Sequence, residues 1–310
     1  MWTLVAGVFM GWSLGANDAA NLFGPMVGSG AMRFWTAAIL ASIFVLVGAT
    51  TVGSGCFATY DAIGTQTLLS AFLVTLAAGL TVTLMTVLGL PVSSTQAVVG
   101  AILGAGLLSG GVSFAPLTKI AVSWILTPIG GLVAAYVPYK LLVLFPRALP
   151  SRVVQRAGVI RVGLILVTCY SAYALGANNV ANVTGVYVSS GLLSPTLGAL
   201  IGALAIGLGI LTFSRRVIET VGSDLVRLDA ITALIAILAE AITLNVYTVI
   251  GVPVSTSQAI VGAVLGIGLV KGVRTIDGRV LLRVLFGWVG TPTIAGLLSA
   301  GLVLGVRLVA

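Results

Sequence analysis

Residues 15–21 read GANDAAN, and residues 176–182 read GANNVAN. A second pair keeps the same spacing, because PVSSTQA at residues 91–97 recurs as PVSTSQA at residues 253–259. Both pairs lie about 160 residues apart, so the chain contains two copies of one unit. Each tract places amide, carboxylate or hydroxyl side chains within apolar sequence, where unsatisfied polar groups are costly. The tracts are therefore candidate ligand-binding elements.

The composition around these tracts is that of a membrane protein. Hydrophobic residues make up 59% of the chain, charged residues make up 7%, and the mean hydropathy is +1.20. Such a chain cannot cover itself with polar surface as a soluble globule does. Apolar stretches of about 20 residues recur, which is the length that a helix needs to cross a bilayer, whereas a β-barrel would show short alternating segments. We predict an all-α integral membrane protein.

The pattern predicts about five membrane segments in each copy. The segments cover residues 2–30, 34–53, 67–89, 91–108, 117–143, 162–190, 192–213, 229–251, 253–270 and 281–308. The domains are then a first repeat at 1–145, a basic linker at 146–161 and a second repeat at 162–310. An odd number of crossings makes the second copy enter from the opposite side, so the repeats are inverted. The short, Gly-rich segments 91–108 and 253–270 are compatible with spanning or re-entry.

The basic residues predict the orientation in the membrane. The net charge is +8, and the charges gather between the predicted segments. With the N-terminus outside, the inner side carries Arg33, Arg147, Arg152, Arg156, Arg161, Arg215, Arg216, Arg227, Lys271, Arg274, Arg279 and Arg283. The outer side carries Lys119 and Arg307, and Lys140 lies near an inner helix end. This distribution predicts a plasma-membrane protein with both termini outside and a cytoplasmic central loop. It reports contact with the lipid bilayer rather than a nucleic-acid partner.

Several classes of chemistry lack the residues that they need. The chain has no histidine, and its two cysteines, Cys56 and Cys169, show no metal-ligand spacing. No nucleotide-binding Gly-Lys signature and no soluble catalytic domain are present. We therefore expect no enzyme activity and no cofactor. The 40 glycines suit close helix packing in lipid and are compatible with a homodimer.

The two Asn-rich tracts are candidate cation sites. Asn17, Asp18 and Asn21 follow about 15 apolar residues, which places them near the middle of the bilayer. Gly11, Gly15 and the Gly24-Pro25 pair would permit a broken helix whose free carbonyls join the side chains around Na⁺. The matching residues of the second copy are Asn178, Asn179 and Asn182. The alternative is that these amides only bond helices together.

The two hydroxyl-rich tracts are candidate anion sites. In each tract a proline precedes a run of hydroxyls and then a small-residue stretch, which is typical of a helix start. The free N–H groups and the positive end of the helix dipole favour an anion. Two such starts entering from opposite faces could hold a tetrahedral oxyanion without Lys or Arg, although capping alone would also explain the hydroxyls. The candidate residues are Ser93, Ser94, Thr95, Gln96, Ser255, Thr256, Ser257 and Gln258.

Two further acidic residues are candidates for coupling. Glu240 lies in the apolar run 230–250, and a carboxyl group within a membrane segment is a functional candidate. A buried, hydrogen-bonded structural role is equally compatible with its position. Glu219 lies beside Arg215 and Arg216, where an ion-pair cluster at the membrane surface is the simpler interpretation.

The four tracts, in this order, resemble the inorganic phosphate transporter (PiT) family. ETVG at 219–222 and GAVLG at 262–266 extend the resemblance, which covers both halves from Gly15 to about Gly110 and from Gly176 to about Gly268. The resemblance implies a cation-coupled phosphate importer built from inverted repeats. It also implies that the Asn-rich tracts help to bind Na⁺ and the anion, and that the hydroxyl motifs contact the anion.

The chain departs from the family pattern at three positions. Asn179 stands where the family usually has Asp, and Gln96 and Gln258 stand where its hydroxyl motifs usually end in His. The loss of one carboxylate would mean fewer coupled cations or a more strictly divalent anion. We therefore predict a secondary active transporter that imports phosphate with Na⁺ or H⁺ by alternating access around a midplane site. A sulfate permease of the same family is the alternative, followed by a passive anion channel.

Overall fold

The computed structural model describes residues 2–28, 30–64, 66–90, 92–109, 112–145, 153–215, 217, 228–272 and 278–309. Within these ranges every regular element is a helix. The first half contains α1 (Leu4–Gly28), α2 (Phe34–Val52), the short 3-10 helix η1 (Gly53–Cys56), α3 (Phe57–Ile63), α4 (Leu68–Val87), α5 (Ser94–Ser109) and α6 (Ala115–Leu144). The second half contains α7 (Val153–Ser189), α8 (Pro195–Thr212), α10 (Ala230–Ile250), α11 (Thr256–Lys271) and α12 (Gly278–Val309).

The all-helical membrane prediction is confirmed. In the described ranges, seven helical stretches are long and apolar enough to cross a bilayer. They are Phe34–Ile63, Leu68–Val87, Ala115–Leu144, Ala157–Ser189, Pro195–Thr212, Ala230–Ile250 and Leu281–Val309. Exposed apolar side chains such as Ile125 on α6 and Val289 on α12 are 66% and 71% accessible, as lipid-facing positions should be. α7 begins at Val153, so the second part of the predicted linker is helical, while residues 146–152 lie outside the described ranges.

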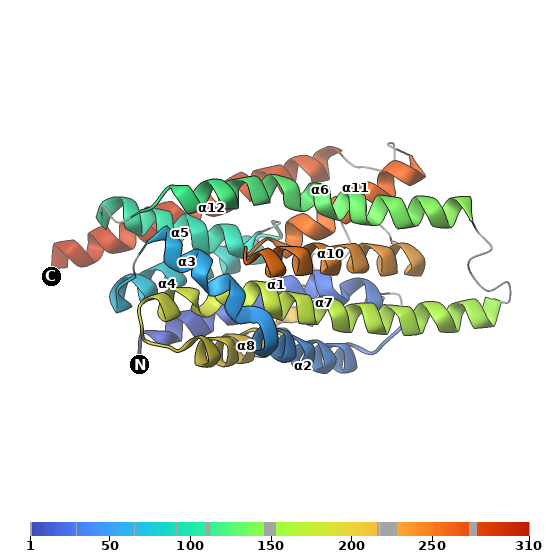
Figure 1. Ribbon diagram of the computed structural model, residues 1–310, viewed down its shortest axis with the longest axis horizontal. Coiled ribbons are helices and arrows are strands. Elements are labelled where there is room, and N and C mark those ends of the chain that lie inside the picture. Colours follow the sequence, from blue (N-terminus) through green and yellow to red (C-terminus); the bar gives the residue numbers. More distant parts are fainter. Residues whose placement is uncertain are drawn as a thin grey trace.

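Helices α5 and α11 begin inside the protein. Each has 16 residues, and at 1.5 Å per residue this gives about 24 Å, less than the hydrocarbon core of about 30 Å. Their first residues, Ser94 and Thr256, are buried. α5 packs against α4, and α11 packs against α10. Figure 1 shows the first pair in the half that holds both chain ends and the second pair in the opposite half. Both helices are thus shorter than a bilayer-spanning helix and start within the protein, which is the geometry of re-entrant segments.

The break that the glycines of the first segment would permit does not occur, because α1 is one continuous helix from Leu4 to Gly28. Its glycines allow close packing on α8 instead. A Cβ added to Gly11 would overlap the side chain of Ala205, and one added to Gly15 would overlap the carbonyl oxygen of Ile206. Small residues of this kind let membrane helices approach to backbone contact. Helices that start at buried residues occur instead after α4 and after α10, at the beginnings of α5 and α11.

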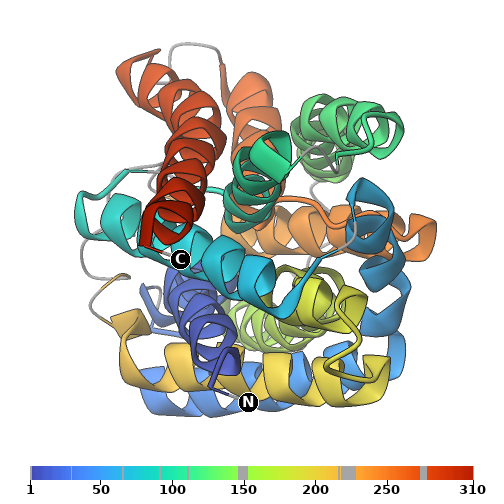
Figure 2. The same cartoon turned by 90° about the vertical axis from the view of Figure 1, so that its left-hand side faces the viewer.

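The two halves are interlocked by matching contacts. Gly15 of α1 meets Ile206 of α8, and Gly176 of α7 meets Val45 of α2. Gly15 and Gly176 are 161 residues apart, and so are Val45 and Ile206. In the same way α5 packs on α12, and α11 packs on α6. Helices of one copy thus pack on helices of the other copy, and both chain ends lie at one end of the molecule (Figure 2).

Candidate functional site

All four repeated tracts meet in one place, because each Asn-rich helix contacts the hydroxyl tract of the other copy. Asn182 on α7 donates a hydrogen bond from Nδ2 to Thr95 Oγ1 on α5, at 3.0 Å. Asn21 on α1 donates from Nδ2 to Ser257 Oγ on α11, at 3.4 Å. Thr95 and Ser257 are matched positions, so the same bond occurs twice. The tracts that the sequence singled out therefore form one cluster built from both halves.

The starts of α5 and α11 are fixed against each other. Thr95 Oγ1 donates to the carbonyl oxygen of Val254 at 3.0 Å, and Ser257 Oγ donates to that of Val92 at 2.8 Å. Each helix is also capped from within its own tract. Ser93 Oγ accepts the N–H of Gln96, and Ser255 Oγ accepts the N–H of Gln258, both at 3.2 Å. Capping uses one N–H group of each first turn, and the other early N–H groups have no partner within their helix.

Asp18 lies between these two helix starts. Its side chain is 0% exposed, and neither carboxylate oxygen meets full hydrogen-bond geometry, although two hydroxyl groups lie close enough to interact with the carboxylate. Its neighbours are the hydroxyls of Ser94, at the start of α5, and Thr256, at the start of α11. Buried polar atoms are nearly always satisfied in folded proteins, so unpaired oxygens at such a depth indicate a group that binds a ligand or ion.

Further unpaired atoms belong to the same tracts. Ser94 Oγ, Asn179 Nδ2, Gln96 Oε1 and Gln258 Oε1 are all buried without a partner. Asn179 is the second-copy match of Asp18, and its Oδ1 accepts a bond from Asn182 at 3.1 Å. A mixture of unpaired donors and acceptors suits a ligand that offers both kinds of partner.

Asn178 and Asn17 hold the re-entrant hairpins in place. Asn178 Nδ2 donates to Thr248 Oγ1 and to the carbonyl oxygen of Val252, both at 3.1 Å, and Asn178 Oδ1 accepts the N–H of Val254 at 2.7 Å. In the first copy Asn17 Nδ2 donates to Thr86 Oγ1 at 2.9 Å. These amides were predicted as cation ligands, and that role stays a prediction; in the structure they bond to the turn between α10 and α11 and to the end of α4.

Two kinds of contact in this cluster were not predicted from the sequence. The Tyr60 hydroxyl donates to Asn182 Oδ1, and Tyr60 lies on α3, in a stretch that the sequence placed between two membrane segments. A single tyrosine outside any repeated tract gave no signal. Thr86 and Thr248 were also missed, although their spacing of 162 residues repeats that of the hydroxyl tracts and could have identified them.

Glu240 brings a second carboxyl group near the cluster. Its side chain is 0% exposed, Oε2 accepts a hydrogen bond from Ser171 Oγ at 3.2 Å, and Oε1 is unpaired. Glu240 and Asp18 interact electrostatically. The other coupling candidate, Glu219, lies outside the described residues.

The residues present suit a hard monovalent cation. Among the described residues, no group of three or more His, Cys, Asp or Glu side chains lies together. Asp18 with amide and hydroxyl oxygens offers only oxygen ligands and a single negative charge at this point, which is the chemistry of an alkali cation rather than of a transition metal.

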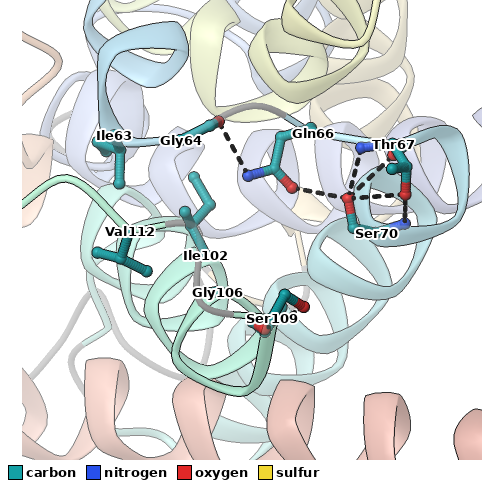
Figure 3. Close-up of a pocket in the computed structure, with 10 residues that line it drawn as sticks. Ile63, Gly64, Gln66, Thr67, Ser70, Ile102, Gly106, Ser109 and Val112 are labelled. Carbon is teal, nitrogen blue, oxygen red and sulfur yellow. Dashed lines mark hydrogen bonds between the residues drawn. The ribbon is translucent and has the colours of Figure 1, made fainter.

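A separate cavity near the chain-end side does not belong to this cluster. It has a volume of about 100 Å³ and lies between the loop before α4 and the end of α5 (Figure 3). Its polar groups satisfy one another, because Gln66 Nε2 donates to the Gly64 carbonyl at 3.3 Å and Ser70 Oγ donates to Gln66 Oε1 at 3.0 Å. Thr67 and Ser70 also form the capping box of α4. These groups stabilise the helix start.

Comparison with known proteins identifies the family. The model of the phosphate transporter family matches residues 14–299. A protein of Methanocaldococcus jannaschii named "Putative phosphate permease" is 31% identical over 295 residues, covering 94% of this chain and 93% of the relative. A protein of the same name from Thermococcus kodakarensis is 28% identical, covering 96% and 95%. A solved structure entitled "The sodium-dependent phosphate transporter" has a TM-score of 0.91 and 25% identity, with 100% of both chains covered. The chain belongs to the phosphate transporter family.

Proposed function

We propose that this protein carries inorganic phosphate across the membrane together with a monovalent cation, by alternating access around the cluster between α5 and α11. The observation that carries the proposal is Asp18, a fully buried carboxylate whose polar neighbours are the hydroxyls of Ser94, at the start of α5, and Thr256, at the start of α11. A cation at Asp18 offsets the negative charge of an anion held by the helix starts. Binding of one ion then raises the affinity for the other, which is coupling by linkage.

The unpaired acceptors favour phosphate over sulfate. At neutral pH phosphate carries at least one P–OH donor, whereas sulfate carries none. Gln96 Oε1 and Gln258 Oε1 are buried acceptors without partners, and a P–OH group can satisfy such an atom. A site that hydrogen-bonds a substrate hydroxyl rejects an analogue that lacks it, because its polar groups stay unpaired. Sulfate remains the second candidate anion, to be tested by competition.

The arrangement of the hairpins supports alternating access. The hairpin of α4 and α5 and the hairpin of α10 and α11 lie in opposite halves of the molecule (Figure 1), and their tips meet through Thr95 and Ser257. We interpret the two copies as inverted repeats. Each copy can then adopt the arrangement that the other has left, so the cluster opens to one side and then to the other.

Uptake into proteoliposomes tests the proposal. Labelled phosphate is supplied outside under an inward Na⁺ gradient, an inward H⁺ gradient or no gradient, each with and without excess sulfate. We expect a cation gradient to drive phosphate above its equilibrium distribution, with little inhibition by sulfate. Uptake that only equilibrates under every gradient would support a passive channel instead, and equal competition by sulfate would support the sulfate alternative.

A further inference from the structure

An apolar groove lies between α5, α6 and α12, and it has a volume of about 500 Å³. Of its lining residues, Leu107 on α5 and Leu297 on α12 are 64% and 71% exposed, as side chains that face lipid are. The Thr293 hydroxyl, which also lines it, donates to the carbonyl oxygen of Val289 at 2.8 Å, so this polar group is already satisfied. An apolar cavity of about 150 Å³ can hold a benzene ring, so this groove has room for a hydrocarbon chain.

The packing of α5 on α12, which forms the groove, is repeated by the packing of α11 on α6. A Cβ added to Gly104 of α5 would overlap the backbone of Gly296, and one added to Gly266 of α11 would overlap the backbone of Leu132. Gly104 and Gly266 are 162 residues apart, and Leu132 and Gly296 are 164 residues apart. The two contacts are therefore matched, and α12 has a glycine where α6 has a leucine.

Small side chains on α12 leave the groove open. One turn beyond Gly296, α12 has Ala300, which also lines the groove. The matched residue of α6 is Tyr136. A leucine and a tyrosine at these two places would occupy the space that glycine and alanine leave free. The groove therefore comes from the difference between the two copies, and not from the repeated fold.

A basic side chain lies at the end of the groove. Arg307 Nη2 donates to the carbonyl oxygen of Leu108 at 3.1 Å, and Leu108 lines the groove. Arg307 follows Ala300 by seven residues, so it lies on the same face of α12, about 10 Å further along the helix. The side chain is exposed. A guanidinium group carries five N–H donors, so the bond to Leu108 leaves others for an anion.

We propose that this groove binds one anionic phospholipid, with an acyl chain between α5 and α12 and the headgroup phosphate at Arg307. In a bilayer an acyl chain gains no hydrophobic free energy by moving from other lipids into a groove, so the lipid is selected by close packing and by the charge of its headgroup. The lipid lies in the leaflet on the side of the chain ends and holds the second half of α5 against α12. This site is separate from the central cluster and does not depend on which anion is carried.

Native mass spectrometry of the purified protein in detergent tests the role of Arg307. Phosphatidylglycerol and phosphatidylcholine with identical acyl chains are added in equal amounts. We expect one phosphatidylglycerol molecule to bind the wild type several-fold more tightly than phosphatidylcholine does. Arg307→Gln should lose this preference, and Arg307→Lys should keep it. Arg283→Gln is the control, because it removes an exposed arginine from the other end of α12, and it should keep the preference.

A second pair of variants tests the groove itself. Ala300→Tyr introduces the residue that α6 has at the matched position, and it should weaken the binding of both lipids several-fold. Gly301→Tyr is the matched control, because Gly301 adjoins Ala300 and is exposed, but it does not line the groove and nothing lies within 4 Å of a Cβ added there. Equal affinity of the two lipids for the wild type, or unchanged binding in Ala300→Tyr, would overturn the site.

The same spectra distinguish a lipid from a second copy of the chain. A dimer that carries no lipid, and that Ala300→Tyr converts to monomers, would show that another copy covers the groove. That result would contradict the lipid site.

A measurement on the wild type covers the case in which the variants do not fold. Phosphatidylglycerol with a diazirine group in its acyl chain is added to proteoliposomes and activated by light, and peptide mass spectrometry locates the label. We expect labelling of residues 100–108 and 292–300 that excess unlabelled phosphatidylglycerol suppresses and phosphatidylcholine does not. Labelling spread evenly over the lipid-facing helices would contradict a specific site.

Discussion

The asparagine side chains of this cluster differ in their hydrogen bonds, and these bonds distinguish residues that hold the backbone from residues that are open to a ligand. Asn178 uses both ends of its amide on the turn that precedes α11. Asn179, its neighbour in sequence, keeps an unpaired Nδ2, while Asp18 keeps both oxygens unpaired. We therefore propose that Asp18 and Asn179 contact the ligand and that Asn178 positions the turn before α11.

Removing the charge of Asp18 should abolish coupling. Asp18→Asn preserves the shape of the side chain but leaves no negative charge between Ser94 and Thr256. We expect the variant to fold and to lose cation-stimulated phosphate uptake by at least about tenfold, equivalent to about 1.4 kcal/mol of binding free energy. Asp61→Asn is the matched control, because Asp61 is exposed and accepts a hydrogen bond from the Ser189 hydroxyl. Unchanged uptake and cation dependence in Asp18→Asn would refute this role.

Removing the amide of Asn178 should destabilise the protein. Asn178→Ala leaves the buried N–H of Val254 and the carbonyl of Val252 without their partner, and each unsatisfied group costs about 1–3 kcal/mol. We expect the melting temperature in detergent to fall clearly below that of the wild type. Asn179→Ala is the comparison, because it removes an amide whose Nδ2 has no partner, and it should lower the melting temperature less. Equal losses in the two variants would contradict the distinction.

At the scale of the helix, part of the structure was predictable from sequence and part was not. The starts of α5 and α11 were predicted correctly because a proline and a capping serine act locally, within three residues. The continuity of α1 was not predictable. Gly11 and Gly15 are compatible with a break until Ala205 and Ile206 are known to pack against them, and that contact joins residues about 190 positions apart. Similarly, nothing near Tyr60 reveals its bond to Asn182.

The packing of α1 on α8 leads to a prediction at this scale. A Cβ at Gly15 would overlap the backbone of Ile206, which cannot rotate away as a side chain could. We expect Gly15→Ala to push the two helices apart and to destabilise the protein by about 1–3 kcal/mol. Gly301→Ala on α12 is the control, because nothing lies within 4 Å of the Cβ it would add. Thermal unfolding in detergent compares them, and equal melting temperatures would argue against the close contact.

At the scale of the molecule, the duplication explains why so much of the site was visible in sequence. Polar tracts stand out in apolar sequence, and their recurrence shows that they belong to one unit. What duplication hides is the difference between the copies. Asn17 and Asn21 are partly exposed, while Asn178 and Asn182 are fully buried, so matched residues do not have equal access to solvent. The sequence alone treats these positions as equivalent.

The orientation in the membrane follows from the distribution of charge over the two ends. Both chain ends lie at one end of the molecule, and the end of α6 and the start of α7 lie at the other (Figure 1). Among the arginines of the predicted inner side, Arg33 is the N-cap residue of α2, and Arg161, in the first part of α7, donates from Nε to the carbonyl oxygen of Ala31. Because basic residues remain on the cytoplasmic side, we predict that the termini are outside and the central loop inside.

Labelling of single cysteines in intact cells tests this orientation. In a background with Cys56→Ala and Cys169→Ala, Leu308→Cys places a thiol near the C-terminus, and Phe145→Cys places one at the end of α6, where the native side chains are 87% and 64% exposed. We expect a membrane-impermeant maleimide to label Leu308→Cys in intact cells and Phe145→Cys only after permeabilisation. The opposite pattern would show that the charges have been assigned to the wrong side. It would also place the α10–α11 hairpin, rather than the α4–α5 hairpin, on the outer side of the membrane, from which the proposed cation gradient drives phosphate.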